Sequence, residues 1–249
     1  MATVHLLGTG AALSDATRTT TMLAVEGPSS LVLIDCGGDA AQRLLAHGLD
    51  LKKLTALIVS HEHADHACGF PLLMERLWLA GIGESFDVHG IAPAIDQARR
   101  LHDVFDTSAW PRYPERRYHV FPEAEGALVL ETADFVVTAT PGNHAVPVAG
   151  FRFEDKSSGR VFVYSCDTER SDAITRLASG ADLLAHEASG KFPGHSSPSD
   201  AAAVAAAAGA KRMVMVHLPP LADPDAYLAE ANAVFSASEL GYDGQRLEF

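Results

Sequence analysis

Short runs of mostly apolar residues recur along the chain, and most of them end in polar residues or glycine. The runs at 54–59, 181–185 and 213–216 are the clearest of these. A run of that length and composition, bounded by polar or turn residues, is typical of a β-strand buried on both faces. We therefore expect central strands that carry polar side chains at their carboxyl ends.

Further strands and helices follow from shorter apolar patterns, turn residues and capping signals. The first strands along the chain should pair as an antiparallel unit, because the turn Gly27–Ser30 separates two of them. The other predicted strands cover 4–7, 20–25, 31–34, 86–89, 128–130, 135–139, 150–154 and 160–164. The predicted helices cover 39–47, 69–79, 93–105, a segment from Ser171 or Asp172 to 178, 200–208 with Ser199 as its cap, and 224–235.

The segment Asp106–Pro122 is predicted to be a loop, because it contains three prolines and a cluster of tryptophan, tyrosine and arginine. Loops on a rigid scaffold often carry binding groups, so this loop could contact a substrate. The alternative, which we favour, is a packed loop whose arginines lie in solvent. The sequence alone does not decide between these two roles of the loop.

The apolar run 54–59 is followed by the sequence SHEHADHACGF, which contains the candidate metal ligands His61, His63, Asp65 and His66. Imidazole nitrogens and carboxylate oxygens suit zinc and related transition metals. His61 and His63 are two positions apart, so their side chains should point to one side, whereas Asp65 and His66 can bind a second metal ion. The spacing therefore predicts two divalent metal ions. We expect zinc, with manganese or iron as alternatives.

This H-x-H-x-D-H pattern resembles the metallo-β-lactamase superfamily of metal-dependent hydrolases. The resemblance implies further ligands downstream, in a fixed order. His144, Asp167 and His217 fit that order, because each follows a predicted strand. Asp35 also follows a strand, and it is either a partner of a ligand or a carboxylate that merely lies near a helix. The predicted ligands are His61, His63 and His144 for one metal and Asp65, His66 and His217 for the other, with Asp167 bridging the two.

The resemblance also implies the fold, which is an α/β, four-layer αββα sandwich of two sheets with helices on their outer faces. A chain of 249 residues can form it as one domain, residues 1–249. No apolar run approaches the roughly 18 to 20 residues of a membrane span, and the first residues lack the basic segment of a signal peptide. Three cysteines, an odd number, suit a reducing compartment. We expect a cytoplasmic protein that does not interact with membranes.

The formal net charge is −13. Binding to long nucleic acids depends on many Lys and Arg contacts to phosphates, so a long nucleic acid is not an expected partner. A small molecule or a short phosphodiester remains compatible with this charge, because two divalent cations would reverse the sign of the charge locally. A homodimer is a further open alternative, which no particular residue identifies.

Further short motifs are Gly8-Thr9-Gly10, Asp167-Thr168, AHEAS at 185–189 and GHSS at 194–197. Through these motifs the chain is similar, within the superfamily, to RNase Z, the transfer-RNA 3′-end endonuclease, and to its phosphodiesterase relatives. The likeness implies that Glu187 orients His195, which protonates the leaving oxygen as a general acid. A histidine beside a carboxylate is in any case a sound proton donor near neutral pH. The predicted catalytic residues are Asp65, which is also a predicted ligand, His195 and Glu187.

Two features differ from the RNase Z pattern. RNase Z carries a protruding basic arm between the third histidine and the bridging aspartate, whereas His144 and Asp167 are only 23 positions apart. The P-x-K-x-R-N loop of that family is replaced by residues 13–19, which keep only the arginine, Arg18. Both changes remove parts that recognise transfer RNA and leave the parts that cleave a phosphodiester.

The sequence therefore predicts a dinuclear metal-dependent phosphodiesterase that acts on a small or exposed phosphodiester, with a hydroxide bridging the two metals as nucleophile. One alternative is an ester or lactone hydrolase of the same superfamily, which the sequence TPGNH at 140–144 also resembles. A second is a true transfer-RNA 3′-processing endonuclease. A non-catalytic scaffold fits less well, because structural zinc sites are usually four-coordinate and closed.

Overall fold

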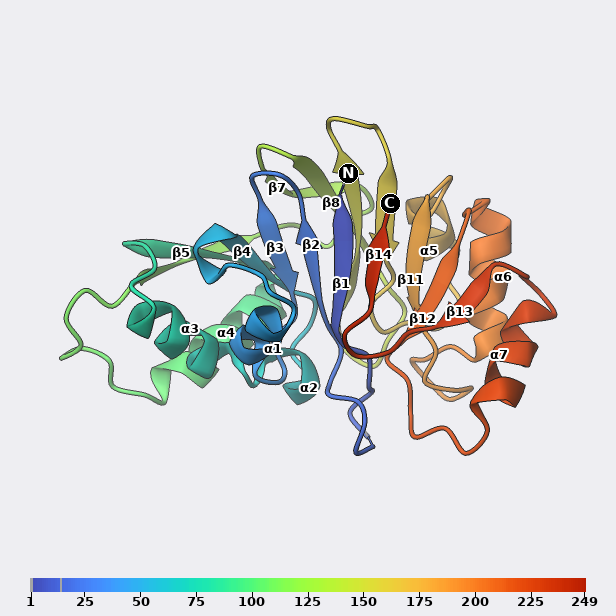
Figure 1. Ribbon diagram of the computed structural model, residues 1–249, viewed down its shortest axis with the longest axis horizontal. Coiled ribbons are helices and arrows are strands. Elements are labelled where there is room, and N and C mark those ends of the chain that lie inside the picture. Colours follow the sequence, from blue (N-terminus) through green and yellow to red (C-terminus); the bar gives the residue numbers. More distant parts are fainter. Residues whose placement is uncertain (1, 14) are drawn as a thin grey trace.

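The computed structural model describes residues 2–13 and 15–249, so Ser14 of the segment 13–19 lies outside the described residues. Within the described chain, two seven-stranded sheets form the centre of the molecule (Figure 1). The first sheet contains, in spatial order, β14 (Arg246–Glu248), β1 (Thr3–Gly8), β2 (Met22–Glu26), β3 (Leu31–Ile34), β4 (Leu54–Val59), β5 (Ser85–Gly90) and β6 (Glu115–Val120).

Both sheets have antiparallel strands on one side and parallel strands on the other. Strands β10 to β13 are parallel, as β3 to β6 are in the first sheet, and β1, β2 and β3 form the predicted antiparallel unit. Because β9 is antiparallel to both β8 and β10, the carboxyl ends of β8 and β10 lie at the same edge. The order is β13 (Ser238–Leu240), β12 (Met213–Val216), β11 (Leu183–Glu187), β10 (Val161–Tyr164), β9 (Ala149–Asp155), β8 (Phe135–Pro141) and β7 (Ala127–Glu131).

Helices cover the outer faces of both sheets, which completes the predicted four-layer αββα sandwich (Figure 1). None of the helices in the described ranges is long and apolar enough to cross a bilayer. The helices beside the first sheet are α1 (Ala40–Ala46), α2 (Ala64–Ala67), α3 (Phe70–Leu79) and α4 (Ala92–Asp103), with a 3₁₀ turn, η1 (Leu51–Lys53). The helices beside the second sheet are α5 (Asp172–Leu177), α6 (Pro198–Ala208) and α7 (Pro224–Asn232).

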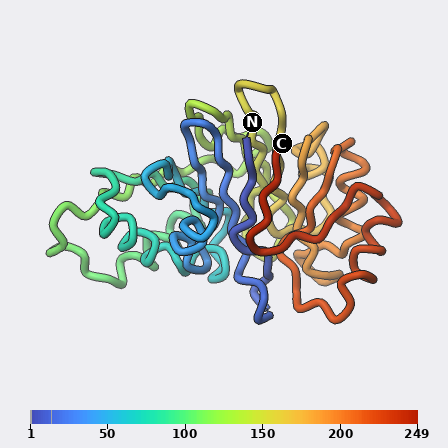
Figure 2. The backbone as a smooth tube through the Cα atoms, in the orientation of Figure 1, coloured from blue at the N-terminus to red at the C-terminus, as the bar shows by residue number. Residues whose placement is uncertain are grey.

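Aromatic rings fill the space between the two sheets. Phe162 of β10 is fully buried, and its ring centroid lies 5.9 Å from that of Phe153 and 5.6 Å from that of Phe249. Phe249 follows β14, which pairs with β1, so the first and last strands of the chain lie side by side (Figure 2). The burial of each such ring contributes roughly 1.5 to 3 kcal/mol to folding.

Several predicted boundaries differ from the structure. β6 occupies part of the segment Asp106–Pro122 that was predicted to be a loop, because an edge strand paired only with β5 tolerates charged residues that hide its pattern. α6 begins at Pro198, and its cap is Ser197 rather than Ser199, since proline is favoured in the first turn of a helix. The three-residue strands β13 and β14 are too short to produce a recognisable pattern.

Replacing Phe162 with alanine should lower the free energy of unfolding by about 3 to 5 kcal/mol, because the cavity between the sheets cannot collapse. Urea denaturation followed by circular dichroism measures this loss. Phe105, whose side chain is 57% exposed, supplies the matched control, and Phe105→Ala should change the unfolding free energy by less than about 0.5 kcal/mol. Equal losses in the two variants would contradict a tightly packed core between the sheets.

Candidate metal centre

Strands from both sheets end at one rim and bring together the side chains predicted as metal ligands. β4 leads into the loop with His61 and His63, and α2 carries Asp65 and His66. In the other sheet, β8, β10 and β12 are each followed by one more predicted ligand. The structure places all seven predicted ligands in overlapping groups, in each of which the ligand atoms lie within 4.8 Å of one another: His61, His63, Asp65, His66, His144, Asp167 and His217.

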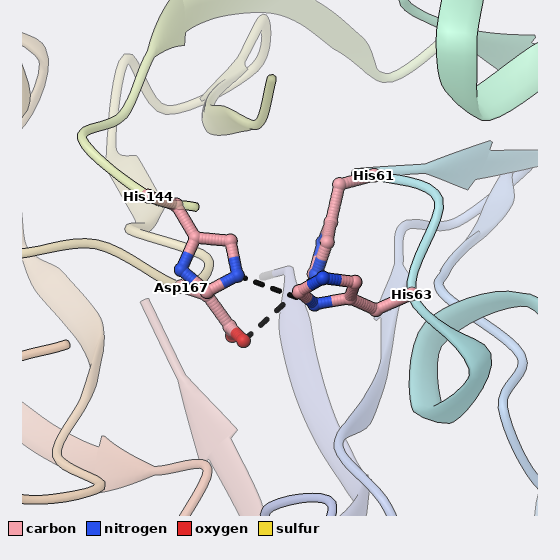
Figure 3. Close-up of side chains that lie close together, drawn as sticks. All are labelled: His61, His63, His144 and Asp167. Atoms are coloured by element: carbon pink, nitrogen blue, oxygen red, sulfur yellow. Dashed lines mark hydrogen bonds and ion pairs between the residues drawn. The ribbon is translucent and has the colours of Figure 1, made fainter. Parts of the chain in front are cut away.

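The first group consists of His61, His63, His144 and Asp167. His144 Nε2 lies 3.2 Å from His63 Nδ1, and His61 Nε2 lies 3.9 Å from Asp167 Oδ2. Figure 3 shows His144 and Asp167 facing the two histidines of the β4 loop across a small gap. This is the set that the sequence assigned to one metal, together with its bridging carboxylate.

The second group consists of Asp65, His66 and His217. His217 Nε2 and His66 Nε2 lie 3.3 and 3.5 Å from Asp65 Oδ2. The same two nitrogens lie 3.3 and 3.5 Å from Asp167 Oδ2, so this carboxylate faces both groups. The arrangement matches the predicted second set.

Three buried polar atoms in these groups make no hydrogen bond within the described chain. They are His61 Nε2, His66 Nε2 and Asp167 Oδ1. A buried polar atom without a partner is costly, and a bound ion or water can offset this cost. Imidazole nitrogens and carboxylate oxygens that converge in this way fit divalent transition metals.

Hydrogen bonds fix three of the histidine rings so that each of these presents its Nε2 atom to the centre. His66 Nδ1 lies 2.8 Å from Asp35 Oδ2, and His144 Nδ1 lies 2.8 Å from the carbonyl oxygen of Gly194. His217 Nδ1 lies 2.6 Å from Ser189 Oγ, whose hydrogen goes to the His217 carbonyl oxygen. Donation from Nδ1 leaves the lone pair on Nε2 free for a metal. His63 differs, because its Nδ1 atom faces the first group.

Asp35 is the partner of a candidate ligand, one of the two roles that the sequence left open for it. Its carboxylate accepts hydrogen bonds from His66, from Ser60 Oγ and from the Ser60 backbone N–H, all at 2.8 Å. Ser60 Oγ in turn lies 3.0 Å from His61 Nδ1. The sequence analysis missed Ser60 and Ser189 in this role, because nothing in the sequence distinguishes them from other loop serines.

Three strands that end near the candidate ligands are each followed by a residue with a strained backbone conformation. Asp35, Cys166 and His217 have φ angles of 60°, 53° and 53°, and they are three of the four non-glycine residues with positive φ in the described chain. Such conformations are uncommon for these residues and cluster at functional sites. They turn the chain sharply just where β3, β10 and β12 end, at the edge occupied by the two groups.

The predicted catalytic pair lies beside these groups. His195 Nδ1 lies 3.3 Å from Glu187 Oε1, and the His195 ring is parallel to that of His217, with 5.7 Å between centroids. Burial alone would lower the pKa of His195, but the Glu187 carboxylate outweighs it, so the pKa lies above the ordinary value. Glu187 is fully buried and accepts hydrogen bonds from the backbone N–H groups of Thr168, Ser189 and Ser196, at distances of 3.3, 2.8 and 2.7 Å.

The loop after β3 packs backbone to backbone against the loop that holds Asp65 and His66. The Cys36 N–H donates to the His66 carbonyl oxygen at 2.8 Å. A Cβ atom on Gly37 would lie 1.7 Å from the Asp65 carbonyl oxygen, a contact that no side chain can relieve. Only glycine at position 37 therefore allows this position of the predicted ligand loop.

Gly37→Ala should displace α2 and weaken metal binding by about 10- to 100-fold, the range seen when the support of a ligand is lost. Metal content by elemental analysis after dialysis against a weak chelator gives the result. The matched control is Gly38→Ala, whose Cβ atom would have only side-chain atoms as its nearest neighbours, those of Thr19, Met22 and Thr20 at 3.1, 3.2 and 3.5 Å. If both variants retain the same metal content, the Gly37 contact does not position the ligand loop.

Comparison with known proteins agrees with this geometry. Residues 31–218 match the family model described as beta-lactamase superfamily domain. Over 306 aligned positions, 30% are identical to a protein named Ribonuclease Z from Synechococcus sp. (strain WH7803), covering 96% of this chain and 94% of the relative. The metallo-beta-lactamase fold protein YhfI from Bacillus subtilis superposes with a TM-score of 0.85 and 24% identity, with full coverage of both chains.

The short form of human tRNase Z superposes with a TM-score of 0.79 and 25% identity, covering 99% of this chain and 98% of the human one. The predicted likeness to RNase Z is thus confirmed along nearly the whole chain. Membership of the matched family implies divalent metal ions, in accord with the clustered histidines and aspartates. The chain belongs to the metallo-β-lactamase superfamily of metal-dependent hydrolases.

Proposed function

We propose that the protein is a dinuclear metal-dependent phosphodiesterase that acts on a small or exposed phosphodiester. The observation that carries this proposal is the ion pair of His195 and Glu187 beside the candidate metal centre. Expulsion of an alkoxide from a phosphodiester requires a proton donor, and the pair supplies one at the edge of the site.

In this proposal His61, His63 and His144 would hold one ion, Asp65, His66 and His217 would hold the other, and Asp167 would serve both. When bound, two divalent ions lower the pKa of a shared water and stabilise the attacking and leaving oxygens. Zinc is the proposed metal, with manganese or iron as alternatives, because histidine and aspartate sets accept all three.

The chain's own residues position and deliver the proton. The Glu187 carboxylate, held by three backbone N–H groups, cannot rotate away from His195 Nδ1. The second ring nitrogen of His195, Nε2, is therefore the proposed donor to the leaving oxygen. The ring itself is fixed by its parallel contact with His217 and by an edge contact with His144, whose centroid is 4.9 Å away.

The short stretch of sequence between His144 and Asp167 supports a small or exposed substrate. It forms the hairpin of β9 and β10, whose connecting turn spans only residues 156–160. The alignment with the Synechococcus relative spans 306 positions, more than the 249 residues of this chain, so the relative contains segments that this chain lacks. The net charge of −13 also disfavours a grip on a long polyanion.

Transfer-RNA 3′-end processing is the second candidate function. The specific observation in its favour is the 30% identity, over 96% of the chain, to a protein named Ribonuclease Z. Cleavage of a transfer-RNA precursor by the metal-loaded protein, at a rate similar to that for a dinucleotide, would favour this candidate.

His195→Ala tests the proposed acid through the leaving group. For the dinucleoside monophosphate ApA, whose leaving alkoxide needs a proton, kcat should fall by about 10²- to 10⁴-fold. For bis-p-nitrophenyl phosphate, which expels a stable phenolate, kcat should fall by less than about 10-fold. The control is His119→Ala, which alters an exposed histidine of β6. Equal losses on both substrates would contradict the role of His195.

Removal of a proposed ligand tests the site as a whole. His66→Ala or Asp167→Ala should abolish hydrolysis of both diesters and lower the bound metal below that of the wild-type protein. Activity that survives in either variant would overturn the proposal.

A lactone substrate assayed on the same preparation separates the phosphodiesterase from an ester hydrolase, because lactone hydrolysis should depend little on His195.

A further inference from the structure

A pocket of about 410 Å³ opens beside His195, on the side of the second sheet. Its wall consists of the turn that follows Asp167 and the loop that precedes α6. The catalytic role proposed for His195 leaves this pocket unexplained. Because the proposed acid forms part of its wall, the pocket lies where the leaving alcohol of a diester must be.

An aromatic ring lies in the pocket next to the proposed acid. The side chain of Phe192 is 50% exposed, although a large apolar ring usually gains by burial. Its centroid lies 4.5 Å from that of His195, at an interplanar angle of 44°. Exposed aromatic side chains beside a nucleic-acid site provide stacking surfaces for bases.

Two cations line the same pocket without an anionic partner. Arg170 and Lys191 are exposed, and within the described chain neither forms an ion pair. Several other exposed cations are paired, for example Arg176 with Glu125 and Lys211 with Asp182, each at 2.7 Å, although Arg100 of α4 also has no ion pair within the described residues. In a chain with a net charge of −13, two unpaired cations beside the proposed acid are suited to an anionic group of a ligand.

The two acidic residues of the pocket are already engaged in local contacts. Glu169 accepts hydrogen bonds from the Gly194 N–H at 2.9 Å and from the Asn143 side-chain amide at 3.0 Å. Asp200 accepts one from Ser197 Oγ at 2.7 Å. These carboxylates hold the pocket walls together, and neither pairs with a cation of the pocket.

We propose that this pocket binds a leaving nucleotide that carries a phosphate of its own. The inference rests on the proposed phosphodiesterase function and names its substrate class, a short oligonucleotide with a terminal 5′-phosphate. The base stacks on Phe192, and the terminal phosphate contacts Arg170 and Lys191. Water forms the new P–O bond, the bond from phosphorus to the 3′-oxygen breaks, and that oxygen takes its proton from His195. The proton released by the attacking water goes to solvent.

The test compares pApA with ApA, which share a scissile bond and differ by one phosphate. For the metal-loaded wild-type protein, kcat/KM should be about 10- to 100-fold higher for pApA, the range expected of charge-assisted hydrogen bonds. The difference should lie mainly in KM. Arg170→Ala and Lys191→Ala should each remove most of this preference, because ApA carries no terminal phosphate for these cations to contact.

Variants of other residues serve as controls. Arg100→Ala alters a cation of α4 that likewise has no ion pair within the described residues, and it should leave the preference intact. Phe192→Leu should raise KM for both dinucleotides by about 5- to 100-fold, whereas Phe192→Trp should retain the wild-type KM. Inhibition of bis-p-nitrophenyl phosphate hydrolysis by AMP should weaken in Arg170→Ala, which tests the same contacts without a dinucleotide.

The outcomes separate the two proposals. If all three diesters resist hydrolysis, the proposed function fails, and the pocket assignment falls with it. If the wild-type protein cleaves ApA and pApA with the same kcat/KM, the phosphodiesterase stands and the phosphate subsite is wrong. Equal effects of Arg170→Ala and Arg100→Ala on the preference would also overturn the subsite.

Discussion

The carboxylate of Asp167 lies buried between two groups of histidines, and the arrangement of the site depends on it. One of its oxygens is within 3.3 to 3.9 Å of ring nitrogens of His217, His66 and His61, while the other makes no hydrogen bond in the described chain. Burial would raise the pKa of Asp167, but His217 and His66 outweigh that effect and hold the pKa below its ordinary value. A buried charge of this kind persists only when cationic partners or metals surround it.

The sandwich provides these surroundings through the direction of its strands. Strands β4, β8, β10 and β12 all end at one rim, where the two sheets meet, so ligands far apart in sequence lie close together. Left-handed residues at 35, 166 and 217 turn the chain at these ends. The rings of His66, His144 and His217 are then fixed by hydrogen bonds from their Nδ1 atoms to aspartate, backbone carbonyl and serine oxygens. The core between the sheets keeps the two halves of the site in register.

Much of the site could be predicted, because its ligands follow local patterns in the sequence. The H-x-H-x-D-H pattern after an apolar run marks ligands at a strand end, and His144, Asp167 and His217 each follow an apolar run in the same way. The rest depends on tertiary contacts. Segments that are far apart in the sequence meet in the hydrogen bonds of Ser60 and Ser189, in the close approach at Gly37 and in the pocket at Phe192. No local sequence pattern predicts that these segments meet. β6 escaped prediction because an exposed edge strand can be highly charged.

The central claim is that each of the two groups of side chains would hold one metal ion, with Asp167 facing both. Anomalous diffraction from crystals of the metal-loaded protein, recorded at the absorption edge of the bound metal, tests it most directly. The account predicts two peaks about 3.5 to 4 Å apart. One should lie among His61, His63 and His144, and the other among Asp65, His66 and His217. A single peak, or peaks remote from Asp167, would contradict it.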